Sequence, residues 1–399
     1  MSLSNGRHTL AIPGPSVIPE AVLQAMHRPA PNIYTGALID MTHSLVPDLK
    51  SIARTGHHVA MYIANGHGSW EAALSNTMSR GDKILVLATG RFCLGWGEIA
   101  NRMGVETQIL DFGRASDIDT DAMAEALKAD KFHEIKAVLA VQVDTSTSVK
   151  NDVTALRKVL DDIGHPALLM IDSIACLGCD AFEMDAWGVD VMVTGCQKGL
   201  MTPPGMSFVF FNDKADAVRE TANCVSHYWD WRPRMAPEMY FQYWDGTAPT
   251  HHLYGLRVAL DMIIEEGLEA VWARHQTLAH GVWAACDAWG QGGPLAMNIK
   301  DPSKRSHAVT SIGIGAPYGT QLRTWLTQEA GVTLGIGLGM GTDEDPNSDG
   351  YFRIGHMGHV NAHMMLGTLG AIDAGLKALE IPHGPNAIEA ASTVYAKRA

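Results

Sequence analysis

The chain has 399 residues, of which 46% are hydrophobic and 18% are charged. This composition excludes a disordered chain, which combines low hydrophobicity with high charge. Acidic residues outnumber basic ones by 43 to 30 and give a formal net charge of -13, so we expect no nucleic-acid partner.

The N-terminal residues predict no export signal, because Pro13-Gly14-Pro15 is reached before any long apolar run develops. The longest apolar stretch, around residues 167–182, contains Asp172 and Asp180 and is too short to span a membrane. Six cysteines are too few for a disulfide scaffold. We therefore expect a cytoplasmic protein with reduced thiols and no membrane partner.

Short apolar or β-branched runs in the first half of the chain predict seven strands. They span residues 59–64, 83–89, 106–112, 136–143, 167–172, 189–194 and 207–211. Helix-spaced apolar residues lie between several of these runs, as at 71–78 and 153–163. Nearly all-apolar strands that alternate with helices predict an α/β fold, with a mainly parallel seven-stranded sheet covered on both faces.

The pattern changes after residue 211. Two long amphipathic helices are predicted from Pro249, with Gly267 between them as a helix stop. Strands are then expected near 311–315 and 352–355, and helices near 320–330 and 366–379. We expect an N-terminal arm (residues 1–20), a large domain (21–270) and a smaller C-terminal α+β domain (271–399).

Ligands of an open parallel sheet bind beyond the carboxyl ends of its strands, where this sequence places polar residues. The turn Asn65-Gly66-His67-Gly68 leads into a helix whose dipole and free amides favour a phosphate, although such turns are also ordinary connections. Asp172 ends an apolar strand and needs either a cationic partner or a helix to cap.

Two further strand ends are polar. Lys198 follows the strand at 189–194, and burial can lower the pKa of such an amine and make it a nucleophile, although most lysines are solvated. The cluster at 144–147 closes another strand, and turn chemistry explains it equally well. Together the four strand ends offer an anion cradle, a carboxylate, an amine and hydroxyls, which are the groups that a phosphorylated pyridine aldehyde needs.

The same segments resemble a known family. Residues 66–74, Asp172-Ser173 and, most specifically, residues 187–208 around Gln197-Lys198-Gly199 resemble the class V pyridoxal-phosphate-dependent aminotransferases of the serine–glyoxylate and alanine–glyoxylate kind. The resemblance extends from residue 12 to residue 358. It implies the PLP-dependent transferase fold (fold type I) and pyridoxal 5'-phosphate as cofactor.

The resemblance also assigns roles to single residues. Lys198 would hold the cofactor aldehyde covalently and move the substrate α-proton, and Asp172 would pair with the pyridine nitrogen. Arg353 would bind the substrate carboxylate as a bidentate fork, with Gly14 and Tyr34 also at the substrate site. The matches to cofactor-binding positions are Gly66, His67 and Gln197 at the phosphate, Thr145 near the ring oxygen, Phe92 on the ring face, and Tyr243 and Thr247.

A homodimer with shared active sites is implied, because the family completes its phosphate site with the segment that matches residues 243–247 of the second subunit. Trp244 stands where the family usually has a tyrosine, so the phosphate lacks one hydroxyl or receives that of Tyr243. The segment around Tyr34 lacks the acidic-His-Arg pattern that is usual in the family near the substrate entrance. A tyrosine near this point resembles the relative pyridoxamine–pyruvate aminotransferase.

The expected activity is transfer of an amino group from a small donor of the serine or alanine type to glyoxylate or pyruvate. The alternatives are a pyridoxamine–pyruvate aminotransferase, a PLP-dependent lyase or desulfurase of the same fold, and a binding protein without activity. Desulfurases carry a Ser-x-His-Lys segment and a mobile cysteine, whereas this chain has Cys196-Gln197-Lys198.

Two further motifs are interpreted without a catalytic role. Cys176 and Cys179 have the spacing of a metal pair but lack the other ligands of a zinc site, so no metal is expected. The glycine-rich stretch at 335–341 lacks the order of a dinucleotide-binding loop. We expect it to form a flexible loop on the substrate side.

Overall fold

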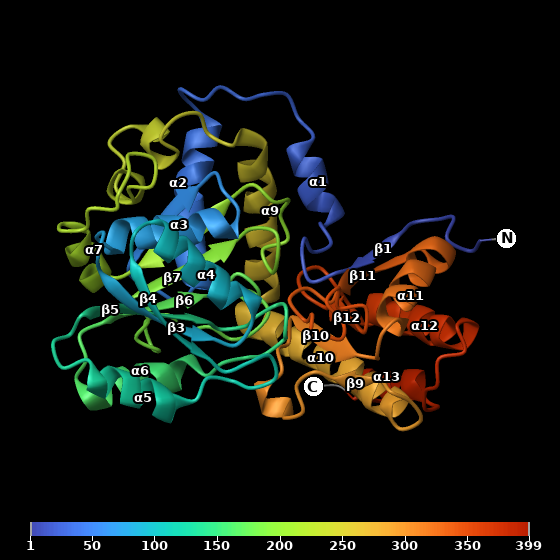
Figure 1. The fold of residues 1–399 in the computed structure, drawn as a ribbon. Helices are drawn as coiled ribbons and strands as arrows, with labels where there is room; N and C mark the ends of the chain where they lie inside the picture. The colour runs from blue at the N-terminus through green and yellow to red at the C-terminus, as the bar shows by residue number, and fades with distance from the viewer. Residues whose placement is uncertain (1, 398–399) are drawn as a thin grey trace.

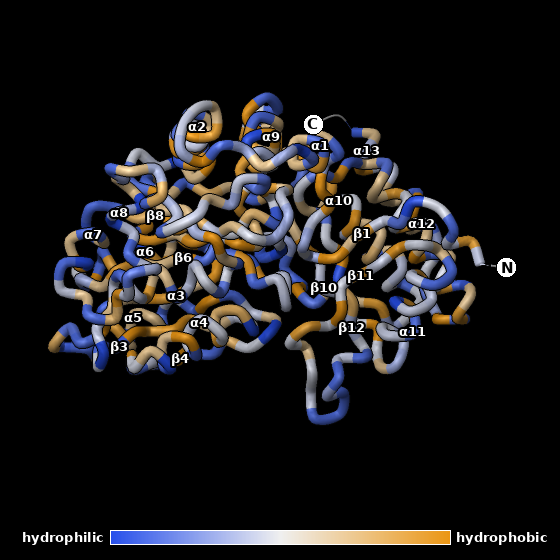
Figure 2. The backbone as a smooth tube through the Cα atoms, turned by 90° about the horizontal axis from the view of Figure 1, so that it is seen from above, coloured by the Kyte–Doolittle hydropathy of each residue, from blue (hydrophilic) through white to orange (hydrophobic). Residues whose placement is uncertain are grey.

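The computed structural model describes residues 2–397, which form two lobes joined by one long helix (Figure 1). The larger lobe contains a seven-stranded sheet and the smaller lobe a five-stranded sheet. Several strands of the large sheet are coloured as hydrophobic, and hydrophilic segments recur in the loops at the periphery (Figure 2). Within the described residues, no helix is both long and apolar enough to cross a membrane.

The large sheet has the strand order β2-β8-β7-β6-β5-β3-β4. The strands from β3 to β7 pair in parallel, and β8 runs antiparallel to both of its neighbours. The seven predicted strands are therefore confirmed, with ends that differ by about two residues. Their bounds are β2 (His58–Tyr62), β3 (Lys83–Ala88), β4 (Glu106–Asp111), β5 (Ile135–Val141), β6 (Leu168–Asp172), β7 (Val191–Gly195) and β8 (Ser207–Phe211).

Helices cover both faces of this sheet, as the apolar strands predict. One face packs against α3 (Gly66–Thr77), α4 (Arg91–Arg102) and α7 (Asp213–Arg219). The other packs against α2 (Ala37–Ile52), α5 (Thr120–Ala129), α6 (Val153–Ile163) and α9 (Thr250–Glu266), and α1 (Glu20–Met26) lies against α9. The side chains of Asn65, Asp119, Asp152 and Asn212 cap the starts of four of these helices.

The small sheet has the strand order β1-β11-β12-β10-β9. Its strands are β1 (Thr9–Ala11), β9 (Ala296–Met297), β10 (Val309–Gly313), β11 (Val332–Ile336) and β12 (Tyr351–Gly355), and its helices are α11 (Tyr318–Trp325), α12 (Ala362–Ala378) and α13 (Ala387–Ala396). Strand β1 comes from the N-terminal arm and pairs in parallel with β11, so the blue N-terminal segment crosses to the orange lobe (Figure 1).

The expectation of a flexible loop over residues 335–341 is wrong at its start, because Gly335 and Ile336 end strand β11. A Cβ on Gly335 would lie 2.6 Å from Cδ of Pro13, and one on Gly337 would lie 2.6 Å from Cβ of Tyr351. These glycines allow close approach of neighbouring backbone, which is a common reason for glycine in a strand. The glycines at positions 335 and 337 therefore have a packing reason.

Helix α10 (Leu268–Gly290) joins the two lobes. Leu268 and Val271 near its start belong to the core of the large lobe, whereas Leu278 and Val282 belong to the core of the small lobe. The predicted pair of helices separated by Gly267 is confirmed. The division into domains at residues 20 and 270 stays a prediction, since one helix contributes to both cores.

Candidate active site

A cavity of about 310 Å³ lies beyond the carboxyl ends of β5, β6 and β7. Parallel strands end at the same edge of a sheet, so side chains that are distant in the sequence meet there. The volume is that of a small-ligand site. Of the residues predicted from the sequence, its wall includes Gly14, Gly66, His67, Phe92, Thr145, Asp172, Gln197 and Lys198.

Lys198 lies in the turn after β7, and its amine donates a hydrogen bond to the carbonyl of Pro13. Burial and, to a smaller extent, the nearby Arg353 guanidinium lower the pKa of this amine from 10.5 to about 8, against the attraction of Asp172. About one tenth of the amine is therefore neutral at pH 7, far more than for an ordinary lysine. The neutral amine is the form that attacks an aldehyde.

The N-terminal arm closes over the lysine. Gly14 has a φ of +98°, and a Cβ at this position would lie 2.6 Å from Nζ of Lys198. The hydroxyl of Ser16 donates to the carbonyl of Lys198 at 2.7 Å, and the Ser16 amide donates to the carbonyl of Gln197 at 2.9 Å. Gly14 is thus required both for its backbone conformation and for its lack of a side chain.

Asp172 ends β6 and is 3% exposed. Its Oδ1 accepts the Ile174 amide at 2.6 Å, and its Oδ2 accepts the indole N–H of Trp70 at 2.8 Å. Burial nevertheless raises the pKa of this carboxyl to about 7, and the negative charge of Asp144 adds to the rise. Since an ionised buried carboxylate lacks solvation, a protonated ring nitrogen in the cavity would stabilise it.

Asp144 is a second buried carboxylate, and it organises the start of α4. Its Oδ2 accepts the amide of Phe92 at 2.9 Å, while its Oδ1 accepts the amide and the hydroxyl of Ser146 at 2.9 and 2.5 Å. The turn chemistry anticipated for residues 144–147 is therefore present. Asp144 does more than close a turn, because its bond to the Phe92 amide fixes the start of α4, which presents the Phe92 ring to the cavity.

Arg353 reaches the site from the small sheet and is 6% exposed. It does not itself line the described cavity, but its Nη1 donates to the carbonyl of Thr145, which does, at 2.7 Å. Its Nε donates to the carbonyl of Ile336 at 2.7 Å. Burial lowers the pKa of the guanidinium to about 10, which leaves it cationic at neutral pH.

The start of α3 forms one end of the cavity. The carboxamide of Asn65 accepts the amides of His67 and Gly68 at 3.1 and 3.3 Å and so caps the helix. A Cβ on Gly66 would clash with Ile174. Oε1 of Gln197, in the same cavity wall, is buried without a hydrogen-bond partner in residues 2–397, and such an acceptor marks a place for a hydrogen-bond donor of a ligand.

Three predicted site residues lie elsewhere in the single chain that the structure describes. Tyr34 is 82% exposed on the loop before α2, and Thr247 is exposed before α9. Tyr243, at the end of η1 (Tyr240–Tyr243), is buried with its ring 5.8 Å from that of His43. Their roles stay predictions, and those of Tyr243 and Thr247 concern a second subunit.

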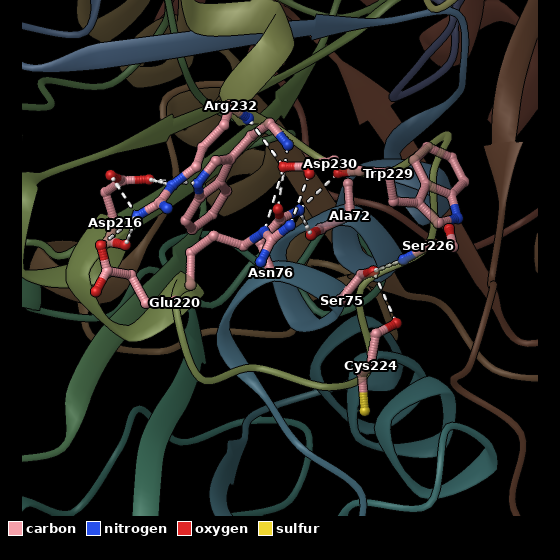
Figure 3. A network of polar contacts seen from close by, with 12 residues as sticks. Ala72, Ser75, Asn76, Asp216, Glu220, Cys224, Ser226, Trp229, Asp230 and Arg232 are labelled. Atoms are coloured by element: carbon pink, nitrogen blue, oxygen red, sulfur yellow. Dashed lines mark hydrogen bonds and ion pairs between the residues drawn. The ribbon is translucent and has the colours of Figure 1, made fainter.

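A polar network fixes the segment that follows α7 to helix α3 (Figure 3). The side chain of Asn76 donates to the carbonyl of Trp229 at 2.6 Å and accepts the amide of Trp231 at 3.1 Å. Asp216 accepts the indole N–H of Trp231 at 2.9 Å and forms an ion pair with Arg232 at 3.0 Å. This segment leads to Tyr243 and Thr247, so its anchoring determines where those residues lie.

Arg234, in α8 (Arg232–Met235), extends this anchoring to the end of β2. The buried guanidinium donates to the carbonyls of Met61, Tyr243 and Tyr228 at 3.0, 2.8 and 2.6 Å. Its carbon also lies 4.4 Å from the ring centre of Tyr62. One side chain thus connects the strand that precedes the Gly66 turn with the segment that carries Thr247.

Within residues 2–397, no group of three or more His, Cys, Asp or Glu side chains could hold a metal ion. The α/β fold, with its mainly parallel seven-stranded sheet and smaller mixed sheet, is that of the fold-type-I aminotransferases. Residues 61–340 match the family model "Aminotransferase class-V". The chain belongs to this family and is an aminotransferase.

Individual relatives agree with this assignment. The chain is 35% identical over 395 residues to the serine–glyoxylate aminotransferase of Arabidopsis thaliana, which covers 98% of this chain and 95% of the relative. Ureidoglycine–glyoxylate aminotransferase from Bacillus subtilis has a TM-score of 0.88 at 24% identity and covers 100% of both chains. Pyridoxamine–pyruvate aminotransferase from Mesorhizobium loti has a TM-score of 0.87 at 24% identity and covers 99% of both. The family and fold predicted from the sequence are confirmed.

Proposed function

We propose that this protein is a pyridoxal 5'-phosphate-dependent aminotransferase that moves an amino group from a small donor, of the serine or alanine type, to glyoxylate or pyruvate. The observation that carries the proposal is that Lys198 and Asp172 line one cavity, where the pKa of the amine is lowered and the pKa of the carboxyl is raised. An amine that loses its proton easily suits an aldehyde, and a buried carboxylate that lacks solvation is stabilised by a protonated ring nitrogen.

The residues of the cavity fit the cofactor. Lys198 would hold its aldehyde, Asp172 its ring nitrogen, and the start of α3 together with Gln197 its phosphate. Gly14 and Gly66 support this assignment, because a Cβ at either position would crowd a side chain of the cavity wall, that of Lys198 or of Ile174. When bound, the cofactor supplies an electron sink for the charge that develops when the substrate loses its α-proton.

The chain's own residues bind the substrate and move its proton. Arg353 is cationic at neutral pH and held by two backbone carbonyls, so it can bind a carboxylate without reorganising. Its burial strengthens that ion pair relative to one in water. The Lys198 amine, with its lowered pKa, can accept the α-proton and return it.

The choice of small substrates is supported by the size of the cavity and by the Arabidopsis relative, whose name specifies serine and glyoxylate. A desulfurase is disfavoured because Cys196 is buried and burial raises the pKa of its thiol to about 11, whereas that chemistry needs an accessible thiolate. The anion-binding start of α3 favours a phosphorylated cofactor over the unphosphorylated vitamin of a pyridoxamine–pyruvate aminotransferase.

We also propose a homodimer in which Thr247 of each chain completes the phosphate site of the other. Large apolar side chains are exposed around the anchored segment: Met239 is 60% and Phe241 is 53% exposed. Clustered exposed apolar side chains are typical of protein interfaces. Thr247 lies six residues further along and is itself exposed.

The proposal is tested by incubating the protein with pyridoxal phosphate, a panel of amino acids, and glyoxylate or pyruvate as acceptor. Serine or alanine with glyoxylate should form glycine with the highest kcat/KM. Turnover only with unphosphorylated pyridoxamine and pyruvate would favour the pyridoxamine–pyruvate alternative. Sulfide release from cysteine without a 2-oxo acid would favour a desulfurase, and no conversion of any donor would overturn the proposal.

A further inference from the structure

Trp70 belongs to the cavity wall but lies on a helix, where the strand-end pattern does not single it out. It is 1% exposed, and its indole Nε1 donates to Oδ2 of Asp172 at 2.8 Å. The backbone amide of Ile174 occupies the other oxygen, Oδ1, at 2.6 Å. Each oxygen of the buried carboxylate therefore has one neutral donor, and one of these donors is a replaceable side chain.

The indole is held firmly in place. The ring of Trp96, on α4, stacks on it with centroids 6.1 Å apart and an angle of 14° between the planes, and Nε1 of Trp96 donates to the Trp70 carbonyl at 3.3 Å. The rings of His67 and Phe92 have their centroids 4.5 and 6.3 Å from that of Trp70. Trp70 thus connects the phosphate end of the cavity with the carboxylate at the ring end.

The charges around Asp172 show why an indole N–H matters here. Asp144 opposes ionisation of Asp172, whereas Lys198 favours it. The neighbouring thiols of Cys93 and Cys176 stay uncharged, because burial raises their pKa well above the usual range. Hydrogen bonds to an ionised acceptor are the strong ones, so the Trp70 N–H favours the carboxylate over the carboxylic acid.

We propose that Trp70 is a positioning residue that keeps the Asp172 carboxylate ionised and oriented, so that the proton shared with the cofactor stays on the ring nitrogen. This inference rests on the proposed function, since it concerns the ring of the proposed cofactor. A buried carboxyl and a ring nitrogen compete for one proton. A donor that stabilises the carboxylate shifts that competition toward the protonated nitrogen, which is the form that draws electrons from the substrate.

Two variants remove the N–H donor. Trp70→Phe keeps an aromatic ring. If the Trp70→Phe protein does not fold, benzothienylalanine at position 70 serves instead, because it replaces the indole N–H by sulfur and keeps the size of the indole. Trp289→Phe is the matched control, because Trp289 is equally buried and its N–H also donates to an aspartate, Asp373 in the small lobe, instead of to Asp172. Asp172→Asn assigns the Asp172 resonance by its loss.

The first measurement is the titration of 13C-labelled aspartate carboxyl groups in the cofactor-free protein. The Asp172 midpoint should move upward by about one pH unit in both Trp70 variants and stay in place in Trp289→Phe. An unchanged midpoint in the Trp70 variants would overturn the inference, and so would an equal shift in the control. This measurement needs no cofactor, so it decides on Trp70 even if the proposed function fails.

The second measurement uses pyridoxal phosphate labelled with 15N in the ring. In the parent protein the ring nitrogen should show the shift of the protonated form, and in the Trp70 variants a shift toward the neutral form. The kcat should fall about tenfold while KM for the amino donor stays within about twofold, because no contact to substrate is lost. A ring nitrogen equally protonated in all variants would contradict the role assigned to Trp70.

Discussion

The guanidinium of Arg353 donates a hydrogen bond from Nη1 to the carbonyl of Thr145 at 2.7 Å, and so joins β12 of the small sheet to the residues that follow β5 of the large sheet. The second bond, from Nε to Ile336, also ends on a backbone carbonyl. The arginine is therefore oriented by the main chain and not by a carboxylate. Its charge stays available for a substrate anion.

Replacing Arg353 by lysine keeps the charge but loses the planar fork and leaves the two carbonyls imperfectly paired. We expect kcat/KM for the amino donor to fall roughly thirty- to hundredfold, or about 2 to 3 kcal/mol. Steady-state kinetics measure this effect. Arg323→Lys is the control, because Arg323 lies in the same lobe and donates to the hydroxyl of Thr320. Equal losses in the two variants would argue against a substrate contact.

Gly14→Ala should disturb the lysine directly. Both Gly14 and Gly81 have a positive φ, +98° and +88°, but only at Gly14 would a Cβ meet the Lys198 side chain. Each substitution should cost about 1 kcal/mol of stability for its backbone conformation. Only Gly14→Ala should also slow the uptake of pyridoxal phosphate, measured by the change in visible absorbance. Normal uptake by Gly14→Ala would contradict the close approach.

Lys198→Met should stabilise the cofactor-free protein at neutral pH. The pKa of Lys198 falls from 10.5 to about 8 on folding, so the folded state binds this proton less tightly than the unfolded chain does. At about 1.4 kcal/mol per pKa unit, the variant should gain roughly 3 kcal/mol in free energy of unfolding at pH 7. The gain should shrink as the pH rises from about 8 and vanish above 10.5.

Denaturant unfolding at several pH values measures this gain. Lys158→Met, at a solvent-exposed lysine, should show no comparable change with pH. A Lys198→Met variant that is less stable than the parent at pH 7, or a gain that does not depend on pH, would show that the amine is not desolvated.

The shared site is tested by combining two defective chains. Lys198→Ala removes the amine and Thr247→Val the exposed hydroxyl, so each homodimer should have low activity. Co-expression with different tags yields a mixed dimer, in which one of the two sites keeps both residues, so about half of the parent activity should return. A mixed dimer no more active than its parents, or a monomeric parent protein, would contradict the homodimer.

The strands of the large sheet could be predicted because each is an apolar run with polar residues at its end. The same pattern indicates Asp172 and Lys198, since parallel strands bring their carboxyl ends together. Strand β11 was not predicted, because glycines that serve close packing, such as Gly335, look like loop residues in a sequence. Trp70 was not predicted either, since its role depends on which helix face meets the end of β6.

The position of Tyr34 could not be predicted from the residues around it. The resemblance places Tyr34 at the substrate entrance, whereas in the single chain it is 82% exposed on a loop outside the cavity. A local motif specifies the turn that carries this side chain. It does not specify whether the turn faces the cavity of its own chain, solvent or a second chain.

Chemical trapping tests whether Lys198 holds the aldehyde of pyridoxal phosphate covalently, as proposed. The protein is loaded with the cofactor, reduced with borohydride, digested and analysed by peptide mass spectrometry. We expect one reduced cofactor adduct, on the peptide that contains Lys198, and its loss in Lys198→Ala. A protein that takes up no aldehyde, or an adduct that resides on another lysine and persists in Lys198→Ala, would contradict it.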